Sequence, residues 1–395
     1  MKPLESLWQS RIDNFQAAKT GIPAYVPVFA QMHDHAAWLA GVPIQEYFTN
    51  PETFVKTAIL ASEYYQFEFP MLVYDAYNIE AEALGQRLIY RGNAIPEIDR
   101  SAPLIKTQGD LARIKIPDPY RAARMPYVLQ ANHFYKEITG INPNLSFCGP
   151  LTLAIQLRGY EQFITDTREN PGFAHELLSF LTEEVSSTWI QTLRKEAGGS
   201  LLVIGVEAWA SLPLVTMEIL NEFFVPYVKR LQEICGEVEV PVGGMWGESY
   251  LKNPERFLRL KIEVGRGRDL SGFDPDVIRL GPEIYKRVAL EHGVPLRLGV
   301  DGHLLRSGPL DQLIERIRYY IRVGAPGGRF FMFLNVIPMD TPPQHIHAAV
   351  KAVHSFGRYP LEFNAEQPEL PVLKEHESFA VFASRLGFPT GGKPG

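Results

Sequence analysis

The chain has 395 residues, of which 46% are hydrophobic and 21% charged, and its formal net charge is −6. This is ordinary globular composition, and no block of like charges indicates binding to nucleic acid or to an anionic membrane. No apolar run reaches the roughly 18 residues of a membrane span, and the amphipathic N-terminus lacks a signal-peptide core. The two cysteines, Cys148 and Cys235, do not resemble a disulfide framework. We expect a cytoplasmic protein.

Short apolar runs rich in β-forming residues recur along the chain, each followed by polar or glycine residues and then by a helical stretch. The eight predicted strands cover residues 24–31, 69–75, 145–149, 201–207, 238–246, 269–274, 295–301 and 329–335. Near-continuous apolar strands that alternate with helices are typical of a parallel sheet covered by helices. Eight such units predict an α/β fold of one domain over residues 1–395, a single (β/α)8 TIM barrel.

Two parts of the chain lie outside the repeating pattern. Residues 76–144 are longer than a normal connection and predict a cap inserted after strand two, with a hairpin and helices over the barrel mouth. Residues 360–395 form a polar, proline-rich tail that we expect on the surface, so that the core covers about 22–359.

In such barrels, functional side chains gather where the strands end at their carboxyl termini. Polar and aromatic residues follow nearly every predicted strand, and they form the candidate site. They are Gln31, His33, Asp34, His35, Asp75, Tyr77, Glu207, Trp209, Trp246, Asp301, His303 and Asn335. The sequence contains no Walker-type loop and no dinucleotide fingerprint.

Several fragments make the chain resemble the uroporphyrinogen decarboxylase superfamily, from about Ile22 to Tyr359. They are VPVFAQ, DAYNIEAEALG, GPLTLAIQLRGYEQFITD, NPGFAHELLSFLTEE, FFVPYVKRL and PMDTPPQHIHAAVKA. The superfamily includes porphyrinogen decarboxylases and zinc-dependent methyltransferases that exchange methyl groups with corrinoid proteins. The resemblance implies a homodimer, and it is nearer to the methyltransferase branch than to the true decarboxylases.

The sequence departs from the true decarboxylases after the first strand. Those enzymes carry an arginine-rich segment there, which holds the carboxylates of the substrate, whereas this chain has AQMHDHAAWL without arginine. Several carboxylates cannot be neutralised without such cations. A porphyrinogen is therefore an unsuitable substrate, although Asp75 matches an aspartate of those enzymes.

The sequence also departs from the methyltransferase branch, which carries a His-x-Cys pair after strand five and a cysteine near strand eight as zinc ligands. The matching segments read VGGMWG and FLNVIPMD. A second ligand arrangement of the branch needs a histidine where this chain has Gly243. The metal ligands therefore stay unknown, with His33, Glu207 and His303 as candidates for zinc.

The stretch His33-Asp34-His35 leaves alternatives open. If the strand continues through both histidines, they point to the same side, toward the mouth. Alternatively, Asp34 caps a helix that begins near Ala36, and the histidines are partly exposed turn residues. Acid–base use, hydrogen bonding to a substrate and metal ligation are the functional alternatives.

From these patterns we predict His33, Asp75 and Glu207 as catalytic residues. The predicted substrate-binding residues are Gln31, His35, Tyr77, Trp209, Trp246, Asp301, His303 and Asn335. Three functions remain open. The first is transfer of a methyl group between a small substrate and a corrinoid protein, with zinc and a partner-borne corrinoid as candidate cofactors. The second is decarboxylation of a substrate with few carboxylates, and the third is ligand binding without catalysis.

Overall fold

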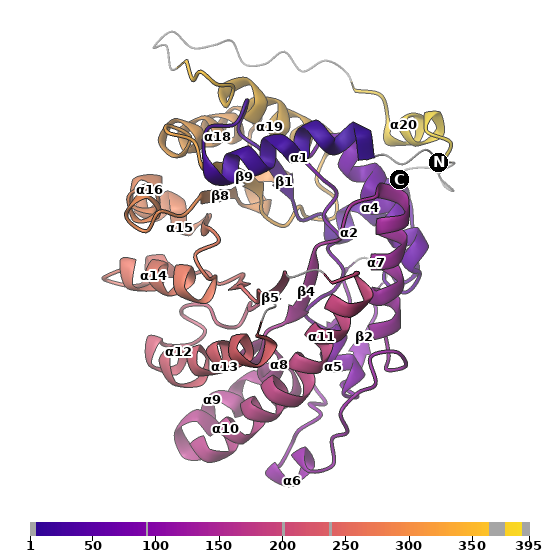
Figure 1. Cartoon of the computed structure of the whole chain (residues 1–395), viewed down its shortest axis with the longest axis vertical. Helices are drawn as coiled ribbons and strands as arrows, with labels where there is room; N and C mark the ends of the chain where they lie inside the picture. The colour runs from indigo at the N-terminus through magenta and orange to yellow at the C-terminus, as the bar shows by residue number, and fades with distance from the viewer. Residues whose placement is uncertain (1–4, 92–93, 200–201, 237–238, 363–375, 389–395) are drawn as a thin grey trace.

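The computed structural model describes residues 5–91, 94–199, 202–236, 239–362 and 376–388. Its strands lie inside a ring of helices, which passes from α2 and α4 through α7, α8, α14 and α16 to α18 and α19 (Figure 1). The predicted α/β fold is confirmed. No described helix is long and apolar enough to cross a membrane.

The ring strands run parallel in two sheets, of order β1-β9-β8-β7 and β4-β5-β6. Their bounds are β1 Val28–Ala30, β4 Leu145–Cys148, β5 Val203–Val206, β6 Val242–Gly243, β7 Leu270–Phe273, β8 Leu296–Val300 and β9 Phe330–Leu334. β1 pairs with β9, so the first and last strands meet as in a barrel. Within the described residues, the ladder is interrupted between β1 and β4 and between β6 and β7.

The prediction of a strand at 69–75 is wrong, because this segment is extended but joins no ladder. Pro70 has no N–H to give to a neighbouring strand, and its carbonyl accepts a bond from Tyr135 Oη at 3.0 Å. The segment still lies between β1 and β4. Glu68 N donates to Val28 O at 3.1 Å, and Tyr74 Oη bonds both N and O of Ser146.

Alternation along the strands separates the interior of the ring from the layer under the helices. Phe29, Phe273, Phe331 and Phe333 form one buried cluster, while Val28 and Met332 belong to the larger core. The Arg297 guanidinium lies 5.2 Å from the Phe333 ring centre and adds a cation to this aromatic filling. The interior is therefore packed, and a ligand must bind at the strand ends.

α1 precedes the first strand, and the other helices follow strands along the chain. These helices are α1 Glu5–Thr20, α2 His33–Ala40, α3 Ile44–Tyr47, α4 Pro51–Tyr65, α8 Pro150–Arg158, α9 Tyr160–Glu169, α10 Pro171–Phe180, α11 Ser187–Glu196, α12 Met217–Phe223, α13 Val225–Cys235, α14 Glu255–Val264, α15 Asp276–Leu280, α16 Pro282–Glu291, α17 Gly302–Ser307, α18 Leu310–Gly324 and α19 Pro343–Phe356. A π-helical turn, Leu181–Ser186, joins α10 to α11, and a 3-10 turn, η2, covers Glu248–Tyr250. Asn50 caps α4 as its sequence suggests, since its side chain accepts from Glu52 N and Thr53 N.

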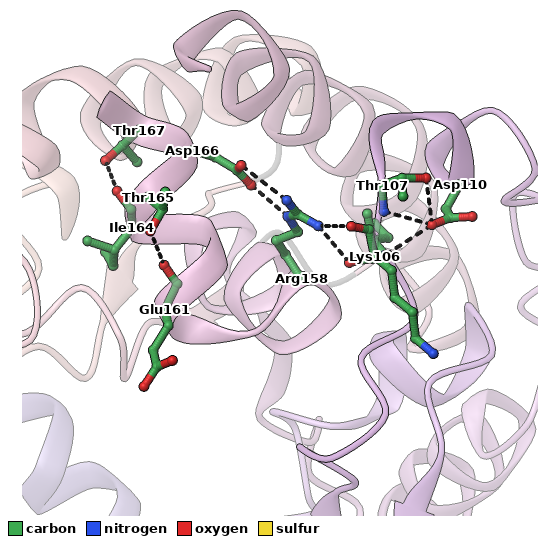
Figure 2. A network of polar contacts seen from close by, with 10 residues as sticks. Lys106, Thr107, Asp110, Arg158, Glu161, Ile164, Thr165, Asp166 and Thr167 are labelled. Carbon is green, nitrogen blue, oxygen red and sulfur yellow. Dashed lines mark hydrogen bonds and ion pairs between the residues drawn. The ribbon is translucent and has the colours of Figure 1, made fainter. Parts of the chain in front are cut away.

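The predicted insertion contains α5 Ile79–Ala83, a hairpin of β2 Leu88–Ile89 and β3 Glu97–Ile98, α6 Gln108–Leu111 and α7 Met125–Thr139. α7 packs between α4 and α11 and belongs to the ring. α5 packs on α8, and Gln108 of α6 donates to Glu176 of α10 at 2.9 Å. Figure 2 shows Arg158 of α8 bound to the Asp166 carboxylate and to the Lys106 carbonyl, which ties this segment to the ring.

The tail, predicted to lie on the surface, has a folded part. α20, Phe379–Arg385, packs on α4 and buries Phe379 and Ala383 (Figure 1). Residues 363–375 and 389–395 of the predicted tail lie outside the described residues.

Candidate functional site at the carboxyl ends of the strands

The two histidines that follow β1 do not share a face. The expectation of a strand through them and that of a helix beginning near Ala36 are both wrong, because α2 begins at His33 and Asp34 does not cap it. His35 is fully buried, with Nδ1 at 2.8 Å from Met339 O and Nε2 at 2.8 Å from Tyr65 Oη. Both its nitrogens are therefore used within the fold, which leaves none for a substrate or a metal.

His33 is the freer of the two histidines. Its Nδ1 is buried without a hydrogen-bond partner, and burial lowers its pKa to about 4. The imidazole is therefore neutral near pH 7 and can accept a hydrogen bond, but a pKa this low makes it a weak base. It is a poor proton donor at that pH.

Asp75 lies at the centre of a buried ion-pair network. Arg124, at the start of α7, donates from Nη2 to Asp75 at 2.7 Å and from Nε to Glu82 at 2.6 Å. Asn78 donates a further 2.7 Å bond to Asp75. Burial raises the pKa of Asp75 to about 6, although Arg124 acts in the opposite direction.

Arg124 is the residue that sequence reasoning missed most clearly at this site. It lies 49 positions after Asp75 in a segment without helical periodicity that would single it out. Its Nη1 is buried without a partner. The network joins the end of the extended segment at 69–75 to the insertion.

Glu207 follows β5 and lies against the amino end of α8. Its carboxylate accepts hydrogen bonds from Leu151 N at 3.0 Å, Thr152 N at 2.9 Å and Thr152 Oγ1 at 2.6 Å. Helix amino ends carry free N–H groups and partial positive charge, so a carboxylate is favoured there. Burial nevertheless raises the pKa of Glu207 to about 7.

Gly149 makes the contact between Glu207 and α8 possible. A Cβ atom at this position would lie 2.2 Å from Glu207 Oε1. Gly149 is the first residue of GPLTLAIQLRG, one of the fragments that carry the family resemblance. Its missing side chain leaves room for the Glu207 carboxylate. Glu207 has a structural task in addition to any chemical one.

A third buried carboxyl, Glu80 of α5, was not predicted. Its Oε1 accepts from Cys148 N at 2.8 Å, while Oε2 is buried without a partner. Burial raises its pKa to about 8. Glu80 sits within the fragment DAYNIEAEALG, five residues after Asp75, but one acidic residue in a short apolar helix is a weak signal. Cys148 is a buried free thiol beside it.

The aromatic candidates divide into inner and outer residues. Tyr77 lies near Gly244, where an added Cβ would be 3.9 Å from its Oη and 3.4 Å from Glu207 N. Trp209 is half-buried and stacks on Tyr160 with ring centres 5.1 Å apart. Trp246 is exposed. Tyr77 therefore lies beside the cluster of buried carboxyl side chains formed by Asp75, Glu80 and Glu207. Trp246 lies outside this cluster.

The remaining candidates lie at the ends of β1, β8 and β9. Asp301 caps α17 by accepting from Leu304 N at 2.9 Å, and His303 is exposed. Gln31 and Asn335 are half-buried, and their backbones continue the ladder, with Gln31 N bonded to Leu334 O and Asn335 N to Val300 O. Their roles in substrate binding stay predictions.

The candidate metal ligands do not converge. Among the described residues, no three His, Cys, Asp or Glu side chains are grouped so that they could hold a metal ion. Glu207 is occupied by α8, and His303 is exposed on a different segment from His33. The residues present therefore do not fit a zinc centre, and no step through zinc is derived for this chain.

Comparisons with known proteins agree with this architecture. The family model of uroporphyrinogen decarboxylase (URO-D) matches residues 13–356, and the chain belongs to this family. A uroporphyrinogen decarboxylase of Anaeromyxobacter dehalogenans is 24% identical over 330 residues, which cover 80% of this chain and 88% of that protein. One of Myxococcus xanthus is 27% identical over 297 residues, covering 71% and 75% respectively.

Two solved structures share the fold. A methyltransferase from Methanosarcina mazei superposes with a TM-score of 0.71 at 21% identity, covering 87% of this chain and 98% of that one. A B12-independent methionine synthase from Shewanella gives a TM-score of 0.50 at 11% identity, covering 84% and 96%. At these identities the likeness concerns the fold.

Proposed function

We propose that the protein transfers a methyl group between a small substrate bound at the strand ends and a corrinoid carried by a partner protein that docks over them. The observation that carries the proposal is a rim of exposed large apolar side chains on the segments that follow β1, β6, β7 and β9. The rim consists of Trp38, Trp246, Tyr250, Ile278 and Val336. Segments that follow parallel strands lie at the carboxyl-end face of the sheet, and exposed apolar side chains on such segments suit a surface that a partner covers.

The buried carboxyls supply the acid that such a transfer requires. When a methyl group leaves a heteroatom, the bond to carbon breaks, the heteroatom keeps the electron pair, and a proton neutralises it. A carboxyl whose pKa lies near the working pH is suited to this task, and the pKa values of Asp75 and Glu207 are raised to about 6 and about 7. Both carboxyls accept hydrogen bonds within the fold, Glu207 from α8 and Asp75 from Asn78 and Arg124, so either one must give up a contact to donate a proton. We test Asp75 first.

The rival function is decarboxylation, which the names of the curated relatives favour. Residues 31–40 contain no arginine, and Arg124, which pairs with Asp75, is already shared with Glu82. Asp75 is therefore held by a fixed cation and is less available to stabilise a cation developing on a substrate. Methyl transfer makes no such demand.

The test uses free cobalamin in place of the partner-borne corrinoid. Cob(I)alamin is incubated with the protein and a panel of methyl donors that contains alcohols, methylamines, thioethers and aryl methyl ethers. We expect one class of donor to yield methylcobalamin, followed by absorbance, and Asp75→Asn to slow the reaction at least tenfold. Release of carbon dioxide from a panel of substrates that carry one or two carboxylates, without methylcobalamin from any donor, would establish the lyase instead.

The docking face needs a separate measurement. Trp38→Ser and Tyr250→Ser should weaken binding of a methylcobalamin-loaded corrinoid protein at least tenfold, with turnover of free cobalamin unchanged. Leu290→Ser is the matched control, because Leu290 is exposed at the end of α16 and away from the rim. Equal binding by all three variants would refute the docking face.

A further inference from the structure

The C-terminal segment, residues 376–388, is held on the ring by aromatic contacts. Tyr64 of α4 packs edge-on against Phe379 at 5.4 Å and donates from Oη to Glu377 O at 2.8 Å. Phe379 and Ala383 are buried by this docking. α20 has seven residues, which is too short to form a stable helix by itself in water. Its structure therefore depends on the surface that it covers.

A pair of imidazole rings closes one end of this docking. His376 stacks on His347 of α19 with ring centres 3.7 Å apart and planes 6° apart. His347 is 7% exposed, and its Nε2 is buried without a hydrogen-bond partner. The stack is compatible with neutral rings, but a second proton would place two cations in contact.

Among the described residues, the side chains that contact His347 bring no negative charge to balance a protonated imidazole. α4 contributes the Tyr64 and Tyr65 rings, whose centres lie 4.7 and 5.0 Å from the imidazole. The Glu377 carboxylate, on the segment itself, is bound to Arg385 at 2.5 Å. Lys351, one turn later on α19, is cationic and has an interaction of its own. Burial, followed by the His376 charge, lowers the pKa of His347 to about 4.

We propose that the C-terminal segment is a latch that mild acid releases from α4 and α19 through protonation at the His347–His376 stack. When the segment leaves, His347 becomes solvated and its pKa returns toward the ordinary value near 6.5. Because the docked pKa lies below the free one, docking is at full strength above about pH 6.5 and weakens as pH falls toward 4.

The latch is linked to the mouth of the ring. Tyr65 packs against His347, and its Oη bonds His35 Nε2, while His35 Nδ1 bonds Met339 O in the segment between β9 and α19. His35 lies on α2, whose first residue is the candidate His33. When the segment leaves, Tyr65 loses packing on one side. We expect this to weaken the contacts that hold α2, which follows β1, and the segment after β9.

Hydrogen exchange measured by mass spectrometry tests the latch on the full chain. Protection of residues 376–388 is compared with that of α18 between pH 7.5 and 5.5, after correction for intrinsic exchange rates. We expect protection of the segment to fall about tenfold across this range, from the difference between a free pKa near 6.5 and a docked one near 4. Protection of α18 should stay constant.

The variant His347→Phe keeps an aromatic ring on Tyr64 and Tyr65 but cannot take a proton, so the pH dependence should disappear. His133→Phe, on the exposed face of α7, is the matched control and should behave as the wild type. Constant protection in the wild type, or unchanged pH dependence in His347→Phe, would overturn the proposal. If His347→Phe does not fold, His376→Gln decides the same question at the exposed partner of the stack.

Discussion

At the scale of single residues, the buried charges decide what the site can do. Asp75, Glu80 and Glu207 lie at the ends of neighbouring segments, and burial raises the pKa of each one. Among the described residues, Asp75 is the one of the three that forms an ion pair, with the Arg124 guanidinium. Burial thus moves the pKa of each of these carboxyls toward neutral pH, where a carboxyl can donate a proton.

Arg124→Met should destabilise the protein by about 3–5 kcal/mol, because it leaves the Asp75 carboxylate buried without its cation. The methionine keeps the apolar stem, so the loss reports mainly the charge. Urea unfolding measures the effect. Arg121→Met is the control, since the Arg121 side chain is 88% exposed. A loss below about 1 kcal/mol would mean that other groups solvate Asp75.

Glu80→Gln should change the pH dependence of stability. The folded pKa of Glu80, about 8, lies above the unfolded value, so its stabilising contribution is complete at low pH and is lost as pH rises through 8. Glutamine cannot ionise, and the variant should gain in unfolding free energy relative to the wild type between pH 5.5 and 8.5. Urea unfolding at both pH values checks this, with the exposed Glu137→Gln as control. A constant difference would show that Glu80 is ionised throughout.

At the scale of elements, the amino end of α8 is built around Glu207. The helix leaves N–H groups of Leu151 and Thr152 without intrahelical partners, and the carboxylate from the neighbouring strand end accepts both. α8 is thereby held to β5, and the close approach requires Gly149. This contact explains why Glu207 is buried although it is charged in part.

Gly149→Ala should destabilise the protein by about 1–3 kcal/mol, because the new methyl group overlaps Glu207 and forces it away from α8. Gly172→Ala, at the start of α10, is a matched control with open space around the added carbon. That variant should be neutral or gain about 0.4–1 kcal/mol from the unfolded state. Thermal unfolding compares the two, and equal midpoints would contradict the role assigned to Gly149.

At the scale of the whole molecule, side-chain hydrogen bonds connect the segments on either side of each interruption in the ladder of the described strands. Tyr74 Oη donates to Ser146 O at 2.6 Å and accepts from Ser146 N at 2.9 Å, which links the extended segment at 69–75 to β4. The Asp276 carboxylate accepts from Gly247 N at 2.6 Å and from Ser249 N at 3.2 Å, which links the segments that follow β6 and β7. These bonds stand where backbone pairs would be expected in a continuous barrel.

Tyr74→Phe should cost about 1–3 kcal/mol, because it leaves a backbone N–H and a carbonyl of β4 without this partner. Exchange of the β4 amides should rise with the loss. Tyr120→Phe removes an exposed hydroxyl and should change the unfolding free energy by less than about 0.5 kcal/mol. Unchanged protection of β4 in Tyr74→Phe would mean that the segment at 69–75 does not close the ring.

Features that depend on nearby residues were predicted correctly more often than features that depend on residues far apart in the sequence. Seven of the eight predicted strands are present, because apolar runs between turn residues are local patterns. The eighth was wrong at Pro70, whose missing donor outweighs the apolar pattern around it. The helix after β1 begins earlier than expected, so His33 and His35 are separated by about 200° around its axis.

By itself, the sequence determined the α/β class, the order of the strands and the family, since these depend on periodicity and on fragments that can be compared along the chain. Only the tertiary structure decided which residue meets which. It joined Arg124 to Asp75, Glu207 to α8 and His376 to His347, over separations of tens of residues. Such pairings carry no local pattern, because they depend on the packing of whole helices, and the charge state of each buried group depends in turn on its partners.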